Sequence, residues 1–448
     1  MQTETTARVA TESVRGLRLP SGAVLLSVLL ALGLQWIIAS IYATLIVDLF
    51  GGARATQAGA GLEMAVAYVM TALATFAVAL YCERRTSASR MIVVVHLLAV
   101  IIPLQALVVA QFEFARPEFA DTVAAAFIGA VAFAGVMPDV RVPPAGRLAR
   151  YALAILATLL TCYVYAALLS HGGLGRLSFD LATVYQVREE FVEDAAPFVG
   201  YLVPWQGYVL NPLLMLLGLR RRAPLVGGLG LGLQLLLFGM TGYRAFLLLP
   251  LLVLGVYLFG RRRQLLALAL MAVLSVIAAA LLLYAWLDQP IIPALLVDRV
   301  IVIPAEIHYW YYDFFGVGAQ PTLQLSQSLL APLSVAHYTT PVPEVIGWKY
   351  MGSAASANVG LFGDAFANFG FAGCFIFALL FALLLKAVDA AGRRADVRMA
   401  AALVAMPAFQ LVNSGLLTTL LTHGLALTII VLWTLPAPPS KDAAREPS

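Results

Sequence analysis

Charged residues are scarce in this sequence. Only 12% of the 448 residues are Asp, Glu, Lys or Arg, whereas 62% are hydrophobic. Because soluble domains carry about 25% charged residues, the 28 basic and 24 acidic side chains cannot cover a water-facing surface of this size. The composition excludes a soluble enzyme, a fibrous protein and a disordered chain. A net charge of +4 is too small to indicate a nucleic-acid partner.

Cysteine and the common catalytic motifs are also lacking. Cys82, Cys162 and Cys374 lie in or at the ends of apolar segments without CxxC spacing, so we predict neither a disulfide framework nor a metal centre. The histidines do not have the spacing of metal ligands, and no GxSxG, P-loop or HExxH motif occurs. We therefore expect no metal and no cofactor.

Continuous apolar runs of membrane-spanning length recur along the chain, and their lack of alternation excludes a β-barrel. They predict an all-α polytopic membrane protein, a single integral domain over residues 1–448 with about 12 transmembrane helices. The last two runs are the least secure, because only a short turn separates them. The predicted spans are 22–47, 62–82, 91–112, 120–138, 150–170, 195–219, 225–243, 245–260, 264–287, 369–389, 399–415 and 419–436.

The basic residues orient these spans. With the N-terminus inside, alternate loops and both tails collect 21 of the 28 basic residues, as the positive-inside rule expects. The tails 1–20 and 437–448 are then cytoplasmic, and the long segment 288–368 is an external loop. The seven bases left on the external side are Arg54, Arg116, Arg176, Arg188, Arg244, Arg299 and Lys349.

Some of these seven cations are candidates for anion binding. Arg54 and Arg116 read as solvated loop charges, and Arg188 has acidic neighbours with which it could simply pair. Arg244 closes a glycine-containing turn at the external end of one span, directly before the next. A charge at such a boundary faces the bundle interior or a wet cavity more often than lipid, although an arginine that extends to the interface is the alternative.

The external loop contains an aromatic stretch that favours an interfacial or re-entrant helix. Arg299, Glu306 and Asp313 are seven residues apart and would lie near one stripe of that helix, with a kink at Pro304. The aromatic run 309–312 would form an interface belt or stack on sugar rings, and the belt is the preferred interpretation.

The end of this loop is rich in glycine and carries an isolated carboxylate. Asp364 and Asn368 are four residues apart and would share a helix face. An aspartate beside the membrane with no basic residue near it in sequence needs a distant cation, a hydrogen-bond network or a catalytic task.

Four segments together resemble the oligosaccharide repeat-unit polymerases, the Wzy-type polymerases of O-antigen, capsule and exopolysaccharide biosynthesis. The similarity covers roughly residues 180–375. The segments are Tyr185-Gln-Val-Arg188, Thr241-Gly-Tyr-Arg244, Arg299…Pro304…Tyr312-Asp-Phe-Phe315, and Ala357-Asn-Val-Gly360 followed by Gly363-Asp364-Ala-Phe-Ala-Asn368-Phe-Gly370.

This resemblance implies a metal-independent glycosyltransferase with a GT-C-like fold in the bacterial inner membrane, with its active site in the periplasm. The donor and acceptor would be oligosaccharides linked to undecaprenyl pyrophosphate, and a chain-length regulator of the Wzz type would be a further partner. Carried over by motif, Arg188, Arg244 and Arg299 would hold the pyrophosphate. Asp364 is the first candidate for the base, followed by Glu306 and His308. Sugar or loop positioning would be done by Tyr185, Tyr309, Tyr312, Asp313, Asn358 and Asn368.

Two other functions remain open from the sequence. A ligase of the O-antigen type would share the donor and the architecture but would transfer the glycan to a different acceptor. A twelve-span transporter or flippase of lipid-linked sugars belongs to another class. Its binding site is expected near the bilayer midplane, often between inverted repeats, whereas the cations of this chain lie at one face and no repeat is visible.

Overall fold

The computed structural model describes residues 21–50, 61–353 and 355–436. This part of the chain is built from helices joined by loops, and no β-strand occurs in it. The predicted cytoplasmic tails, 1–20 and 437–448, and the predicted loop charge Arg54 lie outside the described residues.

Nine helical segments of the described chain are long and apolar enough to cross a membrane, which makes the protein an all-α polytopic membrane protein. In three of them π-helical turns, labelled η, join α-helical pieces. The segments are α2–η1–α3 (Gly22–Ile41, Tyr42–Ile46, Val47–Phe50), α4 (Gly61–Arg84), α5–η2–α6 (Ser89–His96, Leu97–Ile101, Ile102–Val109), α7 (Pro117–Val136), α8 (Arg147–Ser170), α10–η3–α11 (Val199–Trp205, Gln206–Leu210, Asn211–Arg221), α12 (Pro224–Thr241), α14 (Leu265–Leu287) and α18 (Leu361–Gly392).

Three shorter apolar helices occupy the other predicted spans: α13 (Arg244–Phe259), α19 (Val397–Asn413) and α21 (Leu425–Thr434). The last predicted span is divided, because α20 (Leu416–Leu421) precedes α21 as a separate helix. At about 1.5 Å per residue, the 10 residues of α21 cover only half of a hydrocarbon core of about 30 Å. Twelve crossings therefore stay a prediction.

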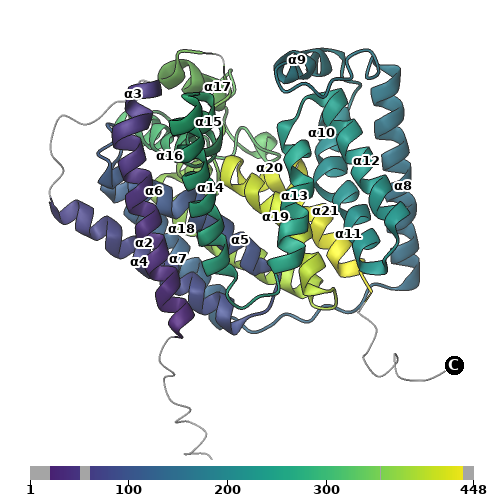
Figure 1. Ribbon diagram of the computed structural model, residues 1–448, viewed down its shortest axis with the longest axis horizontal. Helices are drawn as coiled ribbons and strands as arrows, with labels where there is room; N and C mark the ends of the chain where they lie inside the picture. Colours follow the sequence, from purple (N-terminus) through teal and green to yellow (C-terminus); the bar gives the residue numbers. More distant parts are fainter. Residues whose placement is uncertain (1–20, 51–60, 354, 437–448) are drawn as a thin grey trace, which may run out of the picture.

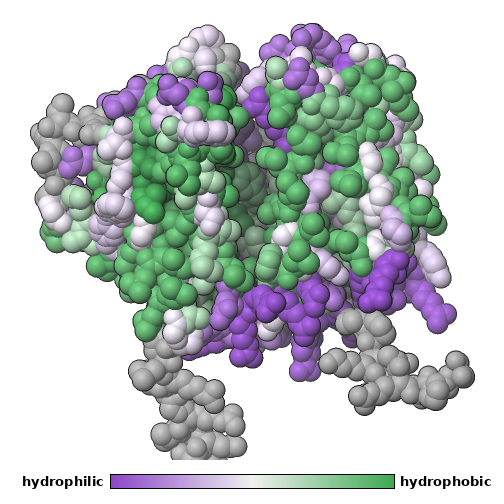
Figure 2. Space-filling model, in the orientation of Figure 1, coloured by the Kyte–Doolittle hydropathy of each residue, from purple (hydrophilic) through white to green (hydrophobic). Residues whose placement is uncertain are grey.

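The helices form two groups side by side, with α19, α20 and α21 lying between them (Figure 1). One group contains α2, α4, α6, α7 and α14, and the other contains α8 and α10–α12. Figure 2 shows a hydrophobic belt between two hydrophilic ends. Leucines inside the apolar helices, such as Leu251 of α13 and Leu282 of α14, are 71% exposed, as expected of side chains that face lipid.

A network of buried neutral side chains joins the helices of the second group. Asn211 accepts a hydrogen bond from Gln206 at 2.7 Å and donates to the Tyr165 hydroxyl and to Gln234, both at 3.1 Å. Thr161, which lies on α8 together with Tyr165, donates to Gln206. Polar side chains inside a bilayer are stabilised by such mutual pairing, because lipid provides no partner.

The predicted external loop is also mostly helical. It contains α15 (Ile291–Pro293), η4 (Ala294–Val302), α16 (Ile303–Tyr312), η5 (Asp313–Val317), the 3₁₀ turn η6 (Ala331–Leu333), α17 (Val342–Ile346) and η7 (Gly347–Met351). Helix α16 is the central element: it packs against α18 and α6, and its residues from Pro304 to Tyr312 are buried.

One expectation for this loop is wrong. Pro304 lies where η4 continues into α16, and the neighbouring residues Val302 and Ile303 have helical dihedral angles, so the predicted kink at Pro304 stays a prediction. The stripe is not kept, since Arg299 is exposed while Glu306 is buried. The reason is the π-helical segment η4, whose wider turn changes the angular register between these positions.

Candidate functional site

Arg188 and Arg244 form a reciprocal pair of cation–π contacts between two segments. Helix α9 (Val184–Asp194) carries Tyr185 and Arg188, and the turn between α12 and α13 carries Tyr243 and Arg244. The Arg188 guanidinium lies 4.8 Å from the centre of the Tyr243 ring, and the Arg244 guanidinium lies 4.6 Å from that of Tyr185. Each arginine therefore stacks on the tyrosine of the other segment.

This packing leaves most guanidinium N–H groups free. Arg188 is exposed and makes no hydrogen bond or ion pair within the described chain, and Arg244 donates only a 3.5 Å bond to the Tyr185 hydroxyl. Stacking uses the planar face of a guanidinium, whereas the N–H donors point outward in its plane. The two arginines can therefore donate hydrogen bonds to an anion while their cation–π contacts stay in place.

Gly242 makes the close approach of these segments possible. Its φ of 66° lies in the left-handed region, which favours glycine. A Cβ atom at this position would overlap the carbonyl oxygen of Val184 and lie 3.0 Å from the backbone nitrogen of Arg188. The first turn of α9 thus lies directly against the α12–α13 turn, which fixes the positions of both arginines.

A separate cavity of about 130 Å³ surrounds the candidate base, Asp364. It lies between the start of α18, the 323–328 segment, the start of α17 and the turn that leads into α20. Its polar lining residues are Tyr311, Gln327, Ser328, Asn358, Asp364, Asn368, Ser414 and Thr418. The cavity therefore combines one carboxylate with hydroxyl and amide groups, which are the usual partners of sugar hydroxyls.

Asp364 is held by its own helix and by the α19–α20 turn. The Asn368 amide donates to the Asp364 carboxylate at 3.2 Å and to the Asp364 carbonyl oxygen at 2.8 Å, so the two residues share a face. Asn368 in turn accepts a 2.7 Å hydrogen bond from the backbone nitrogen of Leu325. On the other side the carboxylate lies against Gly415, where any Cβ atom would overlap it.

The helix carrying Asp364 bends just after Asn368. Phe369 and Gly370 have non-helical dihedral angles, so residues 361–368 form a short helix in front of the main part of α18. The bend leaves the carbonyl oxygens of Ala367 and Asn368 without partners in their own helix. The backbone nitrogens of Leu323 and Gln324 donate to them, at 2.9 and 3.3 Å. This pairing places the 323–328 segment over the cavity.

Glu306 and His308, the other candidates for the base, lie in the interior on α16. Burial, together with the charge of Asp298, raises the pKa of Glu306 to about 8, and its carboxyl group is hydrogen-bonded to Tyr42. Burial lowers the pKa of His308 to about 4. The His308 Nδ1 bonds to the Pro304 carbonyl oxygen at 2.6 Å, and its Nε2 has no partner in the described structure. Neither side chain lines the cavity of Asp364.

The aromatic run of α16 is core rather than an interface belt, contrary to the sequence-based expectation. Tyr309 is fully buried between Phe112 and Phe119, and its hydroxyl donates to the Leu104 carbonyl oxygen at 2.8 Å. Tyr312 stacks on Phe119 at 4.9 Å and donates to Glu118. The hydrophobic effect of these large rings outweighs the polar hydroxyl groups, each of which has a partner. Tyr309 and Tyr312 therefore hold α16 in place.

Asp313 belongs to a third group. It accepts a 2.6 Å hydrogen bond from the Tyr350 hydroxyl and pairs with Lys349 at 3.7 Å, while the Tyr350 ring stacks on Trp310. Burial raises the pKa of Tyr350, and the hydrogen bond to Asp313 and its charge raise it further. These contacts attach η7 to the end of α16, so Asp313 positions the loop.

The structure brings together only some of the residues predicted for one site. Arg188, Arg244 and Tyr185 form one cluster, and Asp364, Asn358 and Asn368 form another. Among the contacts of the described residues, none joins Arg299 to either cluster; Arg299 lies exposed on η4.

Helix α20 lies between the arginine cluster and the cavity. Leu417 and Thr418 line the cavity, and the Leu421 carbonyl oxygen accepts a hydrogen bond from Trp205 at the end of α10. The ring of His423, just after α20, approaches Tyr208, which packs on Phe246. Phe246 packs in turn on Tyr243, the ring that supports Arg188. A row of packed rings thus runs from Tyr243 to His423, just after α20, and α20 itself lines the Asp364 cavity through Leu417 and Thr418.

Sequence reasoning missed several residues of this arrangement. Tyr243 lies inside the quoted turn motif, and only its contact with Arg188 shows its role. Ser414, Gly415 and Thr418 come from a turn that hydropathy treats merely as a break between two spans. No local sequence signal identifies them, because their proximity to Asp364 depends on how α18 and α19 pack.

No group of three or more His, Cys, Asp or Glu side chains in the described chain could hold a metal ion. No family model matches this chain, and the searches of curated proteins and of solved structures found no match.

Proposed function

We propose that this protein is a membrane glycosyltransferase that polymerises oligosaccharide repeat units linked to undecaprenyl pyrophosphate, in O-antigen, capsule or exopolysaccharide biosynthesis. It would act at the periplasmic face of a bacterial inner membrane, with a GT-C-like architecture. The observation that carries the proposal is the reciprocal stacking of Arg188 and Arg244, whose free N–H donors suit the oxygens of a pyrophosphate.

In this proposal both groups act on one donor glycan bound beside α20, because the attacking oxygen and the leaving pyrophosphate share the same anomeric carbon. Asp364 takes the proton of an acceptor hydroxyl, and that oxygen attacks the anomeric carbon of the donor glycan. The bond between this carbon and the pyrophosphate breaks, and the negative charge that develops on the leaving group is stabilised by the arginines. Asn358 and Asn368 line the cavity next to Asp364, where they can orient the acceptor sugar.

The first test is polymer formation by Arg188→Ala and Arg244→Ala. Purified protein in lipid nanodiscs is incubated with a defined lipid-linked repeat unit, and the products are separated on a gel. Because each arginine would stabilise charge in the transition state, each substitution should lower the rate by about 100-fold or more. Arg261→Ala is the matched control, because Arg261 is exposed and unpaired in the arginine-rich connection between α13 and α14. Normal rates in both variants, with the protein folded, would contradict a pyrophosphate-binding site at these arginines.

The second test concerns Asp364. Asp364→Asn keeps the shape of the side chain and its contact with Asn368 but cannot accept a proton, so polymerisation should fall by about 100-fold or more. Asn358→Ala is the comparison, because it changes the same cavity without removing the carboxylate, and its effect should be smaller. A rate near that of the wild type for Asp364→Asn would assign the base to another residue.

The same assay separates the alternative functions. A ladder of products from the lipid-linked unit alone indicates a polymerase. A reaction that occurs only after a second acceptor is added indicates a ligase. Flux of the lipid-linked unit across a liposome bilayer without elongation indicates a transporter.

A further inference from the structure

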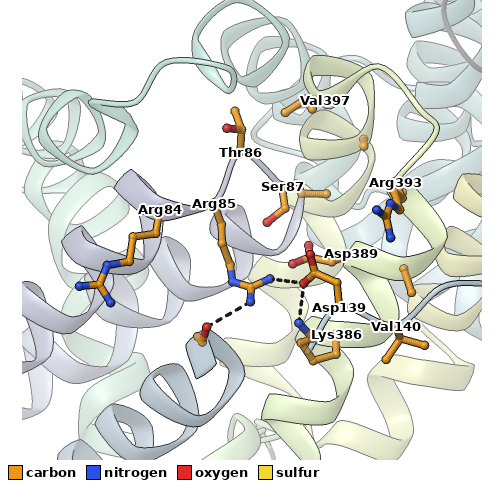
Figure 3. A pocket seen from close by; sticks show the side chains of 15 residues that line it. Arg84, Arg85, Thr86, Ser87, Asp139, Val140, Lys386, Asp389, Arg393 and Val397 are labelled. Carbon is orange, nitrogen blue, oxygen red and sulfur yellow. Dashed lines mark hydrogen bonds and ion pairs between the residues drawn. The ribbon is translucent and has the colours of Figure 1, made fainter. Parts of the chain in front are cut away.

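A second cavity, of about 470 Å³, lies at the other end of α18 from Asp364 (Figure 3). It is enclosed by the ends of α4, α7 and α18 and by the starts of α5 and α19. Residues from this end of the helices belong to the arginine-rich side that the positive-inside rule assigns to the cytoplasm. Its charged and hydroxyl lining residues are Arg84, Arg85, Lys386, Arg393, Asp139, Asp389, Thr86 and Ser87.

Two cations in this cavity share one carboxylate oxygen. Arg85 Nη1 lies 2.7 Å and Lys386 Nζ lies 2.9 Å from Oδ1 of Asp139. The side chain of Lys386 is 3% exposed, whereas that of Asp139 is 62% exposed. Hydrogen bonds from both cations lower the pKa of Asp139 to about 2. Asp139, whose carboxylate is largely exposed to solvent, thus pairs with the buried cation Lys386 and with Arg85.

The two cations do not depend on Asp139 for their position. Lys386 also donates to the Met137 carbonyl oxygen at 3.0 Å, and Arg85 donates to the Gly135 and Met137 carbonyl oxygens at 3.1 and 3.3 Å. These carbonyls stand at and just beyond the C-terminus of α7, where the helix dipole favours positive charge. Both cations would therefore stay in place if the Asp139 carboxylate moved away.

The other charged side chains of the cavity differ in their contacts. Arg393 is exposed, makes no hydrogen bond or ion pair in the described structure, and stands across Asp389 from Arg85 (Figure 3). Arg84 points away from Asp139 (Figure 3). Asp389 is already engaged, because its Oδ1 accepts a 3.1 Å hydrogen bond from the backbone nitrogen of Ser89, at the start of α5. No ion pair joins Asp389 to Arg393 in the described chain.

We propose that this cavity binds a phosphoryl group, for which Asp139 serves as an exchangeable internal counter-ion. A phosphate carries more charge than one carboxylate and has oxygens enough to accept hydrogen bonds from Arg85 and Lys386 together, while Arg393, which also lines the cavity, adds positive charge. The group can belong to an anionic phospholipid of the adjacent leaflet or to a soluble phosphate. Basic pockets between transmembrane helices on the cytoplasmic side suit anionic head groups. The inference is independent of the glycosyltransferase proposal, since the two cavities share no residue.

The test compares neighbouring arginines. Delipidated full-length protein in neutral detergent is titrated with short-chain phosphatidylglycerol in one arm and with inorganic phosphate in the other. Arg393→Gln should weaken binding by about tenfold, the effect of one lost charged hydrogen bond. Arg394→Gln is the matched control, because Arg394 is exposed and adjacent in sequence but does not line the cavity.

Asp139→Asn gives a second variant with the opposite sign. Removing the competing charge should tighten phosphoryl binding by about tenfold, even if the thermal stability of the protein falls. A carboxylate that merely ties helices together would lower stability and leave phosphate affinity unchanged.

The outcomes are distinct. Phosphatidylglycerol binding with this pattern of variants identifies a lipid head group, and the same pattern with inorganic phosphate alone identifies a soluble ligand. Equal affinities of Arg393→Gln and Arg394→Gln for both ligands would overturn the proposal, and so would weaker binding by Asp139→Asn. Polymerisation measurements do not enter this test, so it fails or succeeds separately from the proposed activity.

Discussion

At the residue scale, the partners of a guanidinium group separate structural arginines from arginines available to a ligand. Arg90 is completely buried and donates to the carbonyl oxygens of Gly260, Arg262 and Cys82 at 2.7, 3.2 and 3.4 Å. Arg176 likewise donates to Met240 and His171. Their donors fasten loops to helices. Arg188, in contrast, has only a ring beneath its face, so its donors are free for an anion.

The sequence predicted that the external cations were exceptional but not which of them were available. Arg176 and Arg188 are both predicted to lie on the external side, so the charge pattern does not distinguish them. They differ because Arg176 meets the carbonyl oxygen of Met240, 64 residues along the chain. Only tertiary packing decides such a pairing, and no local pattern records it.

Glu306 provides a prediction about pH. Its folded-state pKa of about 8 lies above the ordinary value of 4.5, because burial and Asp298 disfavour the charged form. The stability that comes from keeping this group neutral is therefore complete below about pH 4.5 and is lost as the pH rises through 8. We expect the melting temperature to fall over this interval, by an amount equivalent to roughly 2–4 kcal/mol.

Glu306→Gln is the variant that tests this expectation, since glutamine stays neutral at every pH. The melting temperature is measured by differential scanning fluorimetry in buffers of pH 5 and pH 9. Between these two buffers, that of Glu306→Gln should fall less than that of the wild type. Glu193→Gln, an exposed position on α9, should behave like the wild type. Parallel curves for Glu306→Gln and the wild type would contradict a buried neutral carboxyl group. In the activity assay, a rate that rises through pH 8 would favour Glu306 as the base.

At the element scale, the position of α9 depends on the α12–α13 turn. Helix α9 has only 11 residues, and Val184, Val187 and Phe191 are its buried side chains. A helix this short is marginal without tertiary contacts. Its contact with Gly242 and the two cation–π pairs are therefore a substantial part of what holds it in place.

Gly242→Ala should detach α9 and reduce polymerisation. The added methyl group would overlap the Val184 carbonyl oxygen, and the positive φ disfavours any side chain, at a cost of about 1–2 kcal/mol for the backbone alone. We expect faster limited proteolysis around α9 and a loss of activity comparable to that of Arg188→Ala.

Gly232→Ala is the control within the same helix α12, because a Cβ atom there meets nothing within 4 Å. That variant should keep both the protease resistance and the activity of the wild type. If Gly242→Ala matches Gly232→Ala in both measurements, the α9 contact is not required for the site.

The elements themselves could be predicted where hydrophobicity alone decides them. The apolar runs located the nine long helices to within a few residues in most cases, but 369–389 was too short for α18, which extends from Leu361 to Gly392. The difference matters because Asp364 lies on the part in front of the bend at Phe369 and Gly370. Hydropathy cannot show a bend that depends on the pairing of Leu323 and Gln324 with the freed carbonyl groups.

At the scale of the whole molecule, the candidate site depends on two groups of helices and the segments between them. The arginine pair belongs to one group, the Asp364 cavity belongs mostly to the other, and α20 contacts both (Figure 1). The sequence assigned these residues to the external side, since charge bias orients spans, and that assignment stays a prediction. It could not indicate that Arg299 lies apart from the other arginines, because that separation results from the packing of η4.

The same charge bias gives a prediction for the whole fold. The described chain begins at α2 and ends after α21 on the same face (Figure 1), as an even number of crossings requires. A cysteine at position 186 on α9 should therefore be accessible from outside, and cysteines at position 221, at the end of α11, and at position 394, after α18, from inside. Cys162→Ser is the background, because Cys162 is exposed while Cys82 and Cys374 are buried.

A membrane-impermeant maleimide added to intact bacterial spheroplasts should label Gln186→Cys and leave Arg221→Cys and Arg394→Cys unlabelled until the membrane is opened. Arg221 and Arg394 are separated by α12, α13, α14 and α18, so agreement between them requires that the short helix α13 crosses the membrane like the three longer ones. Labelling of Arg394→Cys but not of Arg221→Cys in intact spheroplasts would mean that one of these helices does not cross. The membrane sides of the Arg188–Arg244 pair and of the cavity lined by Arg85, Lys386 and Arg393 would then have to be reassigned.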